Sequence, residues 1–303
     1  MRSMPGKFLR FIPGLLLLAA ASVACAHPGW GLQVTLDGRV YFTDLDHVWV
    51  LGDTRVAERW VSDVHAHALY LDDEENLIGD HSGVDDQGIF HTAYWLVTPE
   101  GERRSLPAFE AAAHFGMTTD DGARLLPVSD LHKGQAQVLR LSPDGKTEVV
   151  GGGAFGSVDG PLREARFGAF GAVISNGQGG LLLTSGGQLR AITGQGRVTT
   201  LLGTDAGFPL VTDRRSPLLG LSLAFNGDVF VADIDERHVI RFDRDSRRPV
   251  TVLNSDLGWT ITGVQVEGSY VYLLEYNRLP WSDAVRVRRM DSNGKIELLG
   301  GPP

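Results

Sequence analysis

Histidine is concentrated in one part of this chain, since six of its nine histidines lie between residues 65 and 132. In the segment His65-Ala66-His67 the imidazoles are two residues apart, so on an extended strand both project to the same side. Imidazole nitrogen is a preferred ligand of zinc, and a catalytic zinc keeps one position open for water. We therefore predict a divalent metal site, for zinc or calcium, whose ligands are His65, His67 and His114.

Side chains near these histidines supply groups for proton transfer. We predict Asp80 or Glu275 as the general base that takes a proton from bound water, and His81 as a proton donor or a further ligand. The plain alternative is that histidines on strands lining a channel are hydrogen-bonded to water or to backbone and have no other role.

A repeated pattern of strands must position these residues. Residues 30–41 align with residues 219–230 so that apolar, turn and strand positions coincide. Strand-rich repeats of roughly 40 to 50 residues are typical of propeller blades. The sequence therefore predicts an all-β, six-bladed β-propeller with four strands in each blade. Its units cover about 27–63, 64–109, 110–153, 154–215, 216–256 and 257–301.

The first strand of each unit is predicted to lie innermost, so residues at the starts of these strands become neighbours around the axis. The aligned positions are Trp30, His67, His114, Gly171, Leu219 and Thr262. No segment after the first 26 residues has a sustained helical period, so we expect no helix and no βαβ enzyme fold.

The connection between the third and fourth units carries a family resemblance. It reads Gly151-Gly152-Gly153-Ala154-Phe155-Gly156-Ser157-Val158-Asp159-Gly160, and then Ala165-Arg166-Phe167-Gly168. This resembles the linker between blades of secreted NHL-repeat propellers, and the resemblance covers nearly the whole chain after residue 26. Similarity to peptide-amidating lyase propellers implies a zinc held by histidines from different blades, which His67 and His114 match. Lactonases of the gluconolactonase type resemble the chain in general architecture.

Glycines of the same connection also fit the spacing G-x-G-x-x-G. A dinucleotide site needs a helix that begins at this loop and offers its amide groups, whereas Asp159-Gly160-Pro161 interrupts the chain at once. We therefore expect no cofactor other than the metal.

The first 26 residues have the features of a secretory signal. Three cations, Arg2, Lys7 and Arg10, precede the apolar run 11–21, and Ala24-Cys25-Ala26 fits a cleavage site. We expect this signal to be removed, leaving a single propeller domain over 27–303 in the periplasm or outside the cell, with no transmembrane segment. Lipidation of Cys25 is the alternative, and the absence of leucine three positions before it argues against that outcome.

Charge limits the class of partner. The chain has 28 basic and 37 acidic residues, a net charge of −9, and its arginine pairs are scattered. Nucleic acid requires a basic stripe, so we exclude a nucleic-acid partner.

Two functions stay open. The first is a metal-dependent hydrolase or lyase, lactonase-like, which acts on a small molecule or a sugar derivative at the central channel. The second is a non-catalytic propeller that binds a protein or a glycan. Trp30 and Trp281 are the aromatic residues we expect at a carbohydrate-binding mouth.

Overall fold

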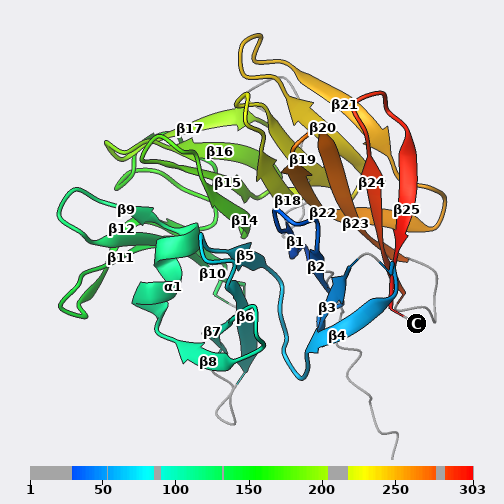
Figure 1. The fold of residues 1–303 in the computed structure, drawn as a ribbon. Helices are drawn as coiled ribbons and strands as arrows, with labels where there is room; N and C mark the ends of the chain where they lie inside the picture. Colours follow the sequence, from blue (N-terminus) through cyan, green and yellow to red (C-terminus); the bar gives the residue numbers. More distant parts are fainter. Residues whose placement is uncertain are drawn as a thin grey trace, which may run out of the picture.

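A computed structural model describes residues 29–52, 54–84, 90–131, 133–203, 218–277 and 284–302. Within these residues the chain forms six antiparallel sheets arranged as blades around an axis (Figure 1). The four strands of each blade are consecutive in sequence and form a meander, and one sheet has a short additional strand at its edge. The predicted all-β, six-bladed propeller of four-stranded blades is confirmed.

The first three blades contain strands β1 to β12. Blade 1 consists of β1 (Leu32–Val34), β2 (Val40–Thr43), β3 (Val48–Leu51) and β4 (Ala57–Val61). Blade 2 consists of β5 (Leu69–Leu71), β6 (Leu77–Val84), β7 (Phe90–Val97) and β8 (Arg103–Leu106). Blade 3 consists of β9 (Met117–Thr118), β10 (Arg124–Asp130), β11 (Gln135–Leu141) and β12 (Thr147–Ala154).

The last three blades complete the ring. Blade 4 consists of β14 (Phe170–Ser175), β15 (Leu181–Ser185), β16 (Gln188–Ile192) and β17 (Arg197–Leu202), with the short β13 (Gly160–Pro161) added outside β17. Blade 5 consists of β18 (Leu218–Leu223), β19 (Val229–Asp233), β20 (His238–Phe242) and β21 (Pro249–Asn254). Blade 6 consists of β22 (Trp259–Glu267), β23 (Tyr270–Asn277), β24 (Val285–Met290) and β25 (Ile296–Gly300).

Blade 3 departs from the regular pattern, and the expectation of no helix is wrong. Helix α1 (Ala108–Phe115) precedes the two-residue strand β9, which pairs only with the first two residues of β10. Four alanines give this segment a high helix propensity. The buried residues Ala111, Ala112 and Phe115 recur at helical spacing and pack with Leu126 of β10.

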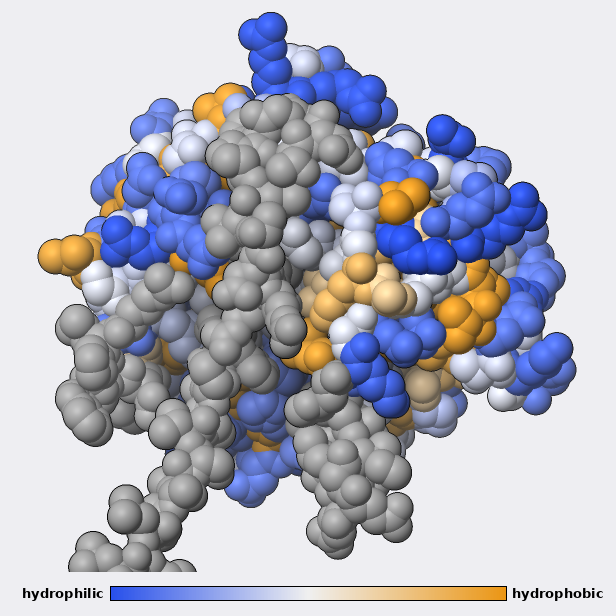
Figure 2. Space-filling view, turned by 180° about the vertical axis from the view of Figure 1, so that it is seen from behind, coloured by the Kyte–Doolittle hydropathy of each residue, from blue (hydrophilic) through white to orange (hydrophobic). Residues whose placement is uncertain are grey.

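Neighbouring blades pack face to face through apolar side chains. One cluster joins Tyr41, Val48 and Val61 of blade 1 to Leu77 and Trp95 of blade 2. Seen from behind, the outer surface is mostly hydrophilic, with small groups of hydrophobic residues between (Figure 2). No helix in the described part of the chain is long and apolar enough to cross a membrane.

Glycines let the innermost strands approach one another closely. Gly220 and Gly263 each lie at a β-bulge between the first two strands of their blade. A Cβ atom on Gly220 would lie 2.6 Å from the Cα of Gly263, and one on Gly263 would lie 2.7 Å from the carbonyl oxygen of Trp30. The backbones of blades 5, 6 and 1 are therefore in contact at the axis, where no side chain fits.

Among the described residues, blades 1 and 6 share no strand where they close the ring. Their faces form one apolar cluster that includes Phe42 of β2 and Leu274 of β23. The Tyr276 hydroxyl donates a hydrogen bond of 3.0 Å to the carbonyl of Thr43. At the outer edge, Arg55 and Glu297 form an exposed ion pair of 2.7 Å, which contributes little stability. Apolar packing is therefore the main interaction that closes the ring.

The contact at Gly263 gives a prediction for stability. Gly263→Ala should lower the free energy of unfolding by about 1–3 kcal/mol, because the added methyl group overlaps the Trp30 carbonyl. Urea denaturation measures this change. Gly52→Ala is the matched control, because nothing lies within 4 Å of its Cβ position. Equal stabilities of the two variants would contradict the proposed close contact.

Candidate active site

Two loops meet where blades 1 and 2 adjoin, and backbone hydrogen bonds hold them together. The amide of Ala66 donates to the carbonyl of Leu45 at 3.0 Å, and the amide of Val64 donates to that of Asp46 at 3.1 Å. The Thr43 hydroxyl donates to the carbonyl of Ala66 at 2.9 Å. Ala66 is fully buried, and the histidines on either side of it are partly exposed. The loop from β4 to β5 therefore has a fixed conformation that presents His65 and His67.

His65 and His67 lie together, as their spacing predicts. Their ring centroids are 4.7 Å apart, with the rings nearly perpendicular at 85°. The Trp30 ring lies on another side of His67, at 5.6 Å between centroids. Two imidazoles and an indole thus form one aromatic group at the junction of blades 1 and 2.

Asp80 of β6 orients His67. The Nδ1 atom of His67 lies 3.0 Å from Oδ2 of Asp80, and both side chains are largely buried. Oδ1 of Asp80 accepts hydrogen bonds from the backbone amides of His67, at 2.8 Å, and Ala68, at 3.0 Å. Burial by itself would raise the pKa of Asp80, but these hydrogen bonds from His67 and Ala68 outweigh it and hold the pKa below the usual value.

His81 follows Asp80 in β6 and contacts His65. Its Nδ1 atom accepts a hydrogen bond of 2.9 Å from the backbone amide of His65. Burial, together with the neighbouring His67, lowers the pKa of His65, so that His65 is neutral at pH 7. Thus the structure brings together four of the predicted site residues, His65, His67, Asp80 and His81, which we call the histidine site.

An open depression lies beside the histidine site. It has a volume of about 370 Å³, and its lining residues are Asp46, His47, Asp63, Val64, His65 and His81. A smaller cavity, with a volume of about 30 Å³, lies among the innermost strands. The depression is the larger of these two spaces and has room for a small molecule.

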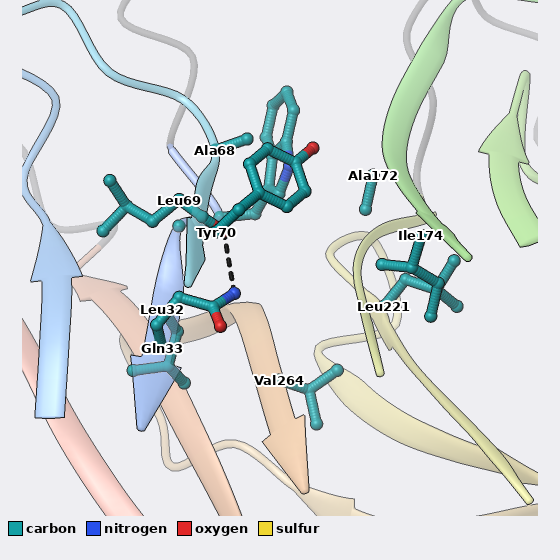
Figure 3. A pocket seen from close by; sticks show the side chains of 11 residues that line it. Leu32, Gln33, Ala68, Leu69, Tyr70, Ala172, Ile174, Leu221 and Val264 are labelled. Atoms are coloured by element: carbon teal, nitrogen blue, oxygen red, sulfur yellow. Dashed lines mark hydrogen bonds between the residues drawn. The ribbon is translucent and has the colours of Figure 1, made fainter. Parts of the chain in front are cut away.

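The axial cavity is lined mainly by apolar side chains from the innermost strands of five blades. Its lining residues are Trp30, Gly31, Leu32, Gln33, Ala68, Leu69, Tyr70, Ala172, Ile174, Leu221 and Val264. In Figure 3, Gln33 donates a hydrogen bond to the Leu69 carbonyl, at 2.7 Å, and the Tyr70 ring extends from blade 2 toward Ala172 of blade 4. Trp30, predicted at the mouth, reaches this cavity, whereas Trp281 lies outside the described residues.

His114 is not at the start of an innermost strand, and that part of the sequence alignment is wrong. It lies in the last turn of α1, because the residues expected to enter a strand form the helix instead. Among the described residues no group of three or more His, Cys, Asp and Glu side chains is arranged to hold a metal ion. The ligand set His65, His67 and His114 therefore stays a prediction.

Glu275 belongs to a separate group of charges in blade 6. It is fully buried, and its carboxylate accepts hydrogen bonds of 2.6 Å from Arg286 and from Arg288. The hydroxyl of Ser255 donates to it at 2.5 Å. Asp256 also contacts both arginines, and the hydrogen bond from Arg286 lowers the pKa of Asp256. Because its carboxylate is directed at two arginines, we assign Glu275 a structural role.

Sequence reasoning did not find two residues of this region. Tyr70 lines the axial cavity, and Asp46 lines the depression. Tyr70 lies three residues after His67, on the first strand of the same blade, which is the signal that could have identified it. Asp46 comes close to His65 through pairing of two loops, which the sequence pattern does not specify.

The lowered pKa of Asp80 predicts how stability depends on pH. Because the folded pKa lies below the ordinary value of 3.8, ionised Asp80 stabilises the fold above that pH, and this stabilisation is lost as the pH falls through the folded pKa. Asp80→Asn should lose about 1–3 kcal/mol at pH 7 and show a smaller further loss than wild type between about pH 4 and pH 2. Urea unfolding across this pH range checks both, with the exposed Asp73→Asn as control. Parallel pH curves for wild type and Asp80→Asn would contradict the assignment.

Comparisons with known proteins support the fold. No family model matches the chain, and no curated protein is significantly similar to it in sequence. A streptogramin B lyase structure matches with a TM-score of 0.53 and 12% identity, over 89% of this chain and 82% of that chain. Virginiamycin B lyase from Staphylococcus aureus matches with a TM-score of 0.51 and 12% identity, over 89% and 83%. A glucose dehydrogenase matches with a TM-score of 0.53 and 10% identity, over 82% and 93%. At these identities the similarity shows a shared β-propeller fold.

Proposed function

We propose that this protein is an enzyme that moves protons at the histidine site, acting as a hydrolase or lyase on a small molecule in the adjoining depression. The observation that carries the proposal is the bond between His67 and Asp80, in which a largely buried carboxylate fixes one nitrogen of an imidazole. A base oriented by a third group is a recurring arrangement in proton-transfer catalysis.

The hydrogen bonds assign the two histidines different roles. Asp80 is ionised, so the Nδ1 atom of His67 must be the donor in their bond. The Nε2 atom of neutral His67 then carries the lone pair, and Asp80 stabilises the imidazolium that forms when His67 takes a proton. Nδ1 of His81 accepts the His65 amide, so Nε2 of neutral His81 carries its proton. His67 therefore serves as general base, and His81 as general acid that protonates the leaving oxygen.

Several features favour a small molecule as substrate. The depression has about 370 Å³, which falls in the range of ligand pockets. The shared fold also includes proteins described as lyases and as a glucose dehydrogenase, so this architecture supports enzyme sites. Lactones, esters and sugar derivatives are the substrates we propose to examine first. Binding of a protein or glycan without turnover is the second function, and the same experiment tests it.

The predicted zinc or calcium ion is an alternative to the general-base role of His67, because Asp80 holds Nδ1 and both roles need the lone pair of Nε2. His67 fits a ligand role, because a ligating imidazole commonly donates its other N–H to a carboxylate, as His67 does to Asp80. His65 lies beside it and would be the second ligand. The assignment of His67 and His81 to proton transfer follows from their own hydrogen bonds.

The predicted signal over residues 1–26, with Cys25, lies outside the described residues. Export to the periplasm or the medium therefore stays a proposal. It fits the choice of a small exported substrate.

Turnover provides the first test. Small lactones, aryl esters and sugar esters are screened with wild type, and His67→Asn and Asp80→Asn are then measured on the compound that turns over. Loss of the base, or of its orientation, should reduce kcat by about 100-fold or more. His238→Asn, in blade 5, is the matched control and should retain wild-type kcat. If kcat of His67→Asn equals that of wild type, the catalytic assignment is wrong, and ligand binding without turnover would favour the second function.

Elemental analysis tests the metal. If His67 is a ligand and not the base, the purified wild-type protein contains one equivalent of zinc or calcium. This ion is lost from His67→Ala and His65→Ala, because each change removes an imidazole ligand. The variant His114→Ala examines the third predicted ligand and should also lose the ion. Wild-type protein that takes up no metal from buffer containing zinc and calcium contradicts this proposal.

A further inference from the structure

Two residues that carry hydrogen-bond donors border the axial cavity. Trp30 and Tyr70, from the start of blade 1 and from β5 of blade 2, both border this cavity of about 30 Å³. The indole Nε1 of Trp30 is buried and has no hydrogen-bond partner among the described residues. A cavity of this size holds an oxygen atom or one to two water molecules.

Tyr70 is held rigidly and stays protonated. Its ring stacks on Phe115 of α1, with centroids 4.7 Å apart and an interplanar angle of 27°. Burial, with Asp80 and Tyr94 nearby, raises the pKa of Tyr70 far above its usual value, so the phenol is a donor at neutral pH. The Tyr70 side chain is partly exposed and borders the axial cavity.

An unpaired donor such as the indole N–H of Trp30 carries a cost. A buried N–H or O–H without an acceptor loses its hydrogen bond to water on folding, and native proteins seldom leave such groups unpaired. An indole can only donate, so any partner of Trp30 Nε1 must be an acceptor. Both donors are neutral, which suits an uncharged oxygen that gains negative charge during a reaction.

We propose that Trp30 and Tyr70 form a binding site for an acceptor oxygen, the carbonyl oxygen of an ester- or lactone-type substrate, at the axis of the ring. This rests on the proposed function and deepens it, because it names the substrate class for the base His67. The Trp30 ring links the two sites, since it borders the cavity and lies 5.6 Å from the His67 ring.

The dimensions define how such a substrate lies. A cavity of about 30 Å³ accepts an oxygen atom, so in this proposal the carbonyl oxygen occupies it and the rest of the molecule extends past the Trp30 ring toward His67. The carbonyl carbon would then lie between the two donors and the base. When water activated by His67 adds to this carbon, the negative charge forms on the oxygen that Trp30 and Tyr70 bind.

The test is a binding experiment with a defined pair of probes on the full-length protein. γ-Butyrolactone has the carbonyl oxygen, and tetrahydrofuran has a similar ring without it. The indole N–H resonance of Trp30, assigned with Trp30→Phe, is followed in ¹H–¹⁵N spectra during titration. We expect a saturable shift with the lactone and none with tetrahydrofuran. Equal shifts for both probes, or no saturable shift with the lactone, would overturn the proposal.

Variants assign the second donor. Tyr70→Phe removes one hydroxyl and should weaken lactone binding about fivefold, the effect expected for one neutral hydrogen bond. Tyr94→Phe is the matched control, because Tyr94 also packs on Phe115 but does not border the cavity. Its affinity should equal that of wild type. Unchanged affinity in Tyr70→Phe would remove Tyr70 from the site.

The variant His67→Asn separates this proposal from the proposed function. It should still bind the lactone, because both donors are present, while turnover of the substrate found in the screen is lost. Retained turnover with lactone binding would reject the role of His67 and leave the acceptor site standing. If His67→Asn loses turnover and the Trp30 resonance does not respond to the lactone, the acceptor site is rejected and the role of His67 is retained.

Discussion

Contact between the backbones of the innermost strands is the constraint on which the rest of this structure depends. Gly220 and Gly263 leave no space for a Cβ atom, so blades 5, 6 and 1 meet at backbone distance. A cavity of about 30 Å³ lies among the innermost strands, and the larger depression lies beside the histidine site. The same backbone contact places the Trp30 carbonyl against Gly263, and the Trp30 ring lies 5.6 Å from the His67 ring.

The histidine site depends on a second interaction, in which the Asp80 carboxylate accepts several hydrogen bonds. Asp80 receives the imidazole of His67 and two backbone amides, and these bonds keep it ionised in a buried place. An ionised Asp80 defines which nitrogen of His67 is protonated. Asp80, a residue of strand β6, thus determines which nitrogen of the site is protonated. The imidazole that it orients, His67, lies in the loop before β5.

The fold could be predicted from the sequence because each blade repeats the same alternation of apolar strands and glycine turns, and all six predicted units match observed blades. The pairing of His65 with His67 follows from strand-like spacing. The helix at 108–115 could not be found by the same reasoning, since eight residues give too short a period, and the error moved His114 to a strand. The sequence also suggests Glu275 as a base, but its two arginine partners come from β24, and strand patterns do not reveal charge pairing.

Among the described residues, blades 1 and 6 share no strand. This affects the order in which the blades and the two sites form during folding. Every described sheet is made of strands that follow one another in the chain, so each blade can form from local contacts as soon as its own segment is available. The histidine site needs only blades 1 and 2. The axial cavity also needs Ala172, Leu221 and Val264 from blades 4, 5 and 6, and becomes complete only when the seam closes. A partly assembled ring would therefore possess the base before it possesses the pocket that receives the substrate oxygen.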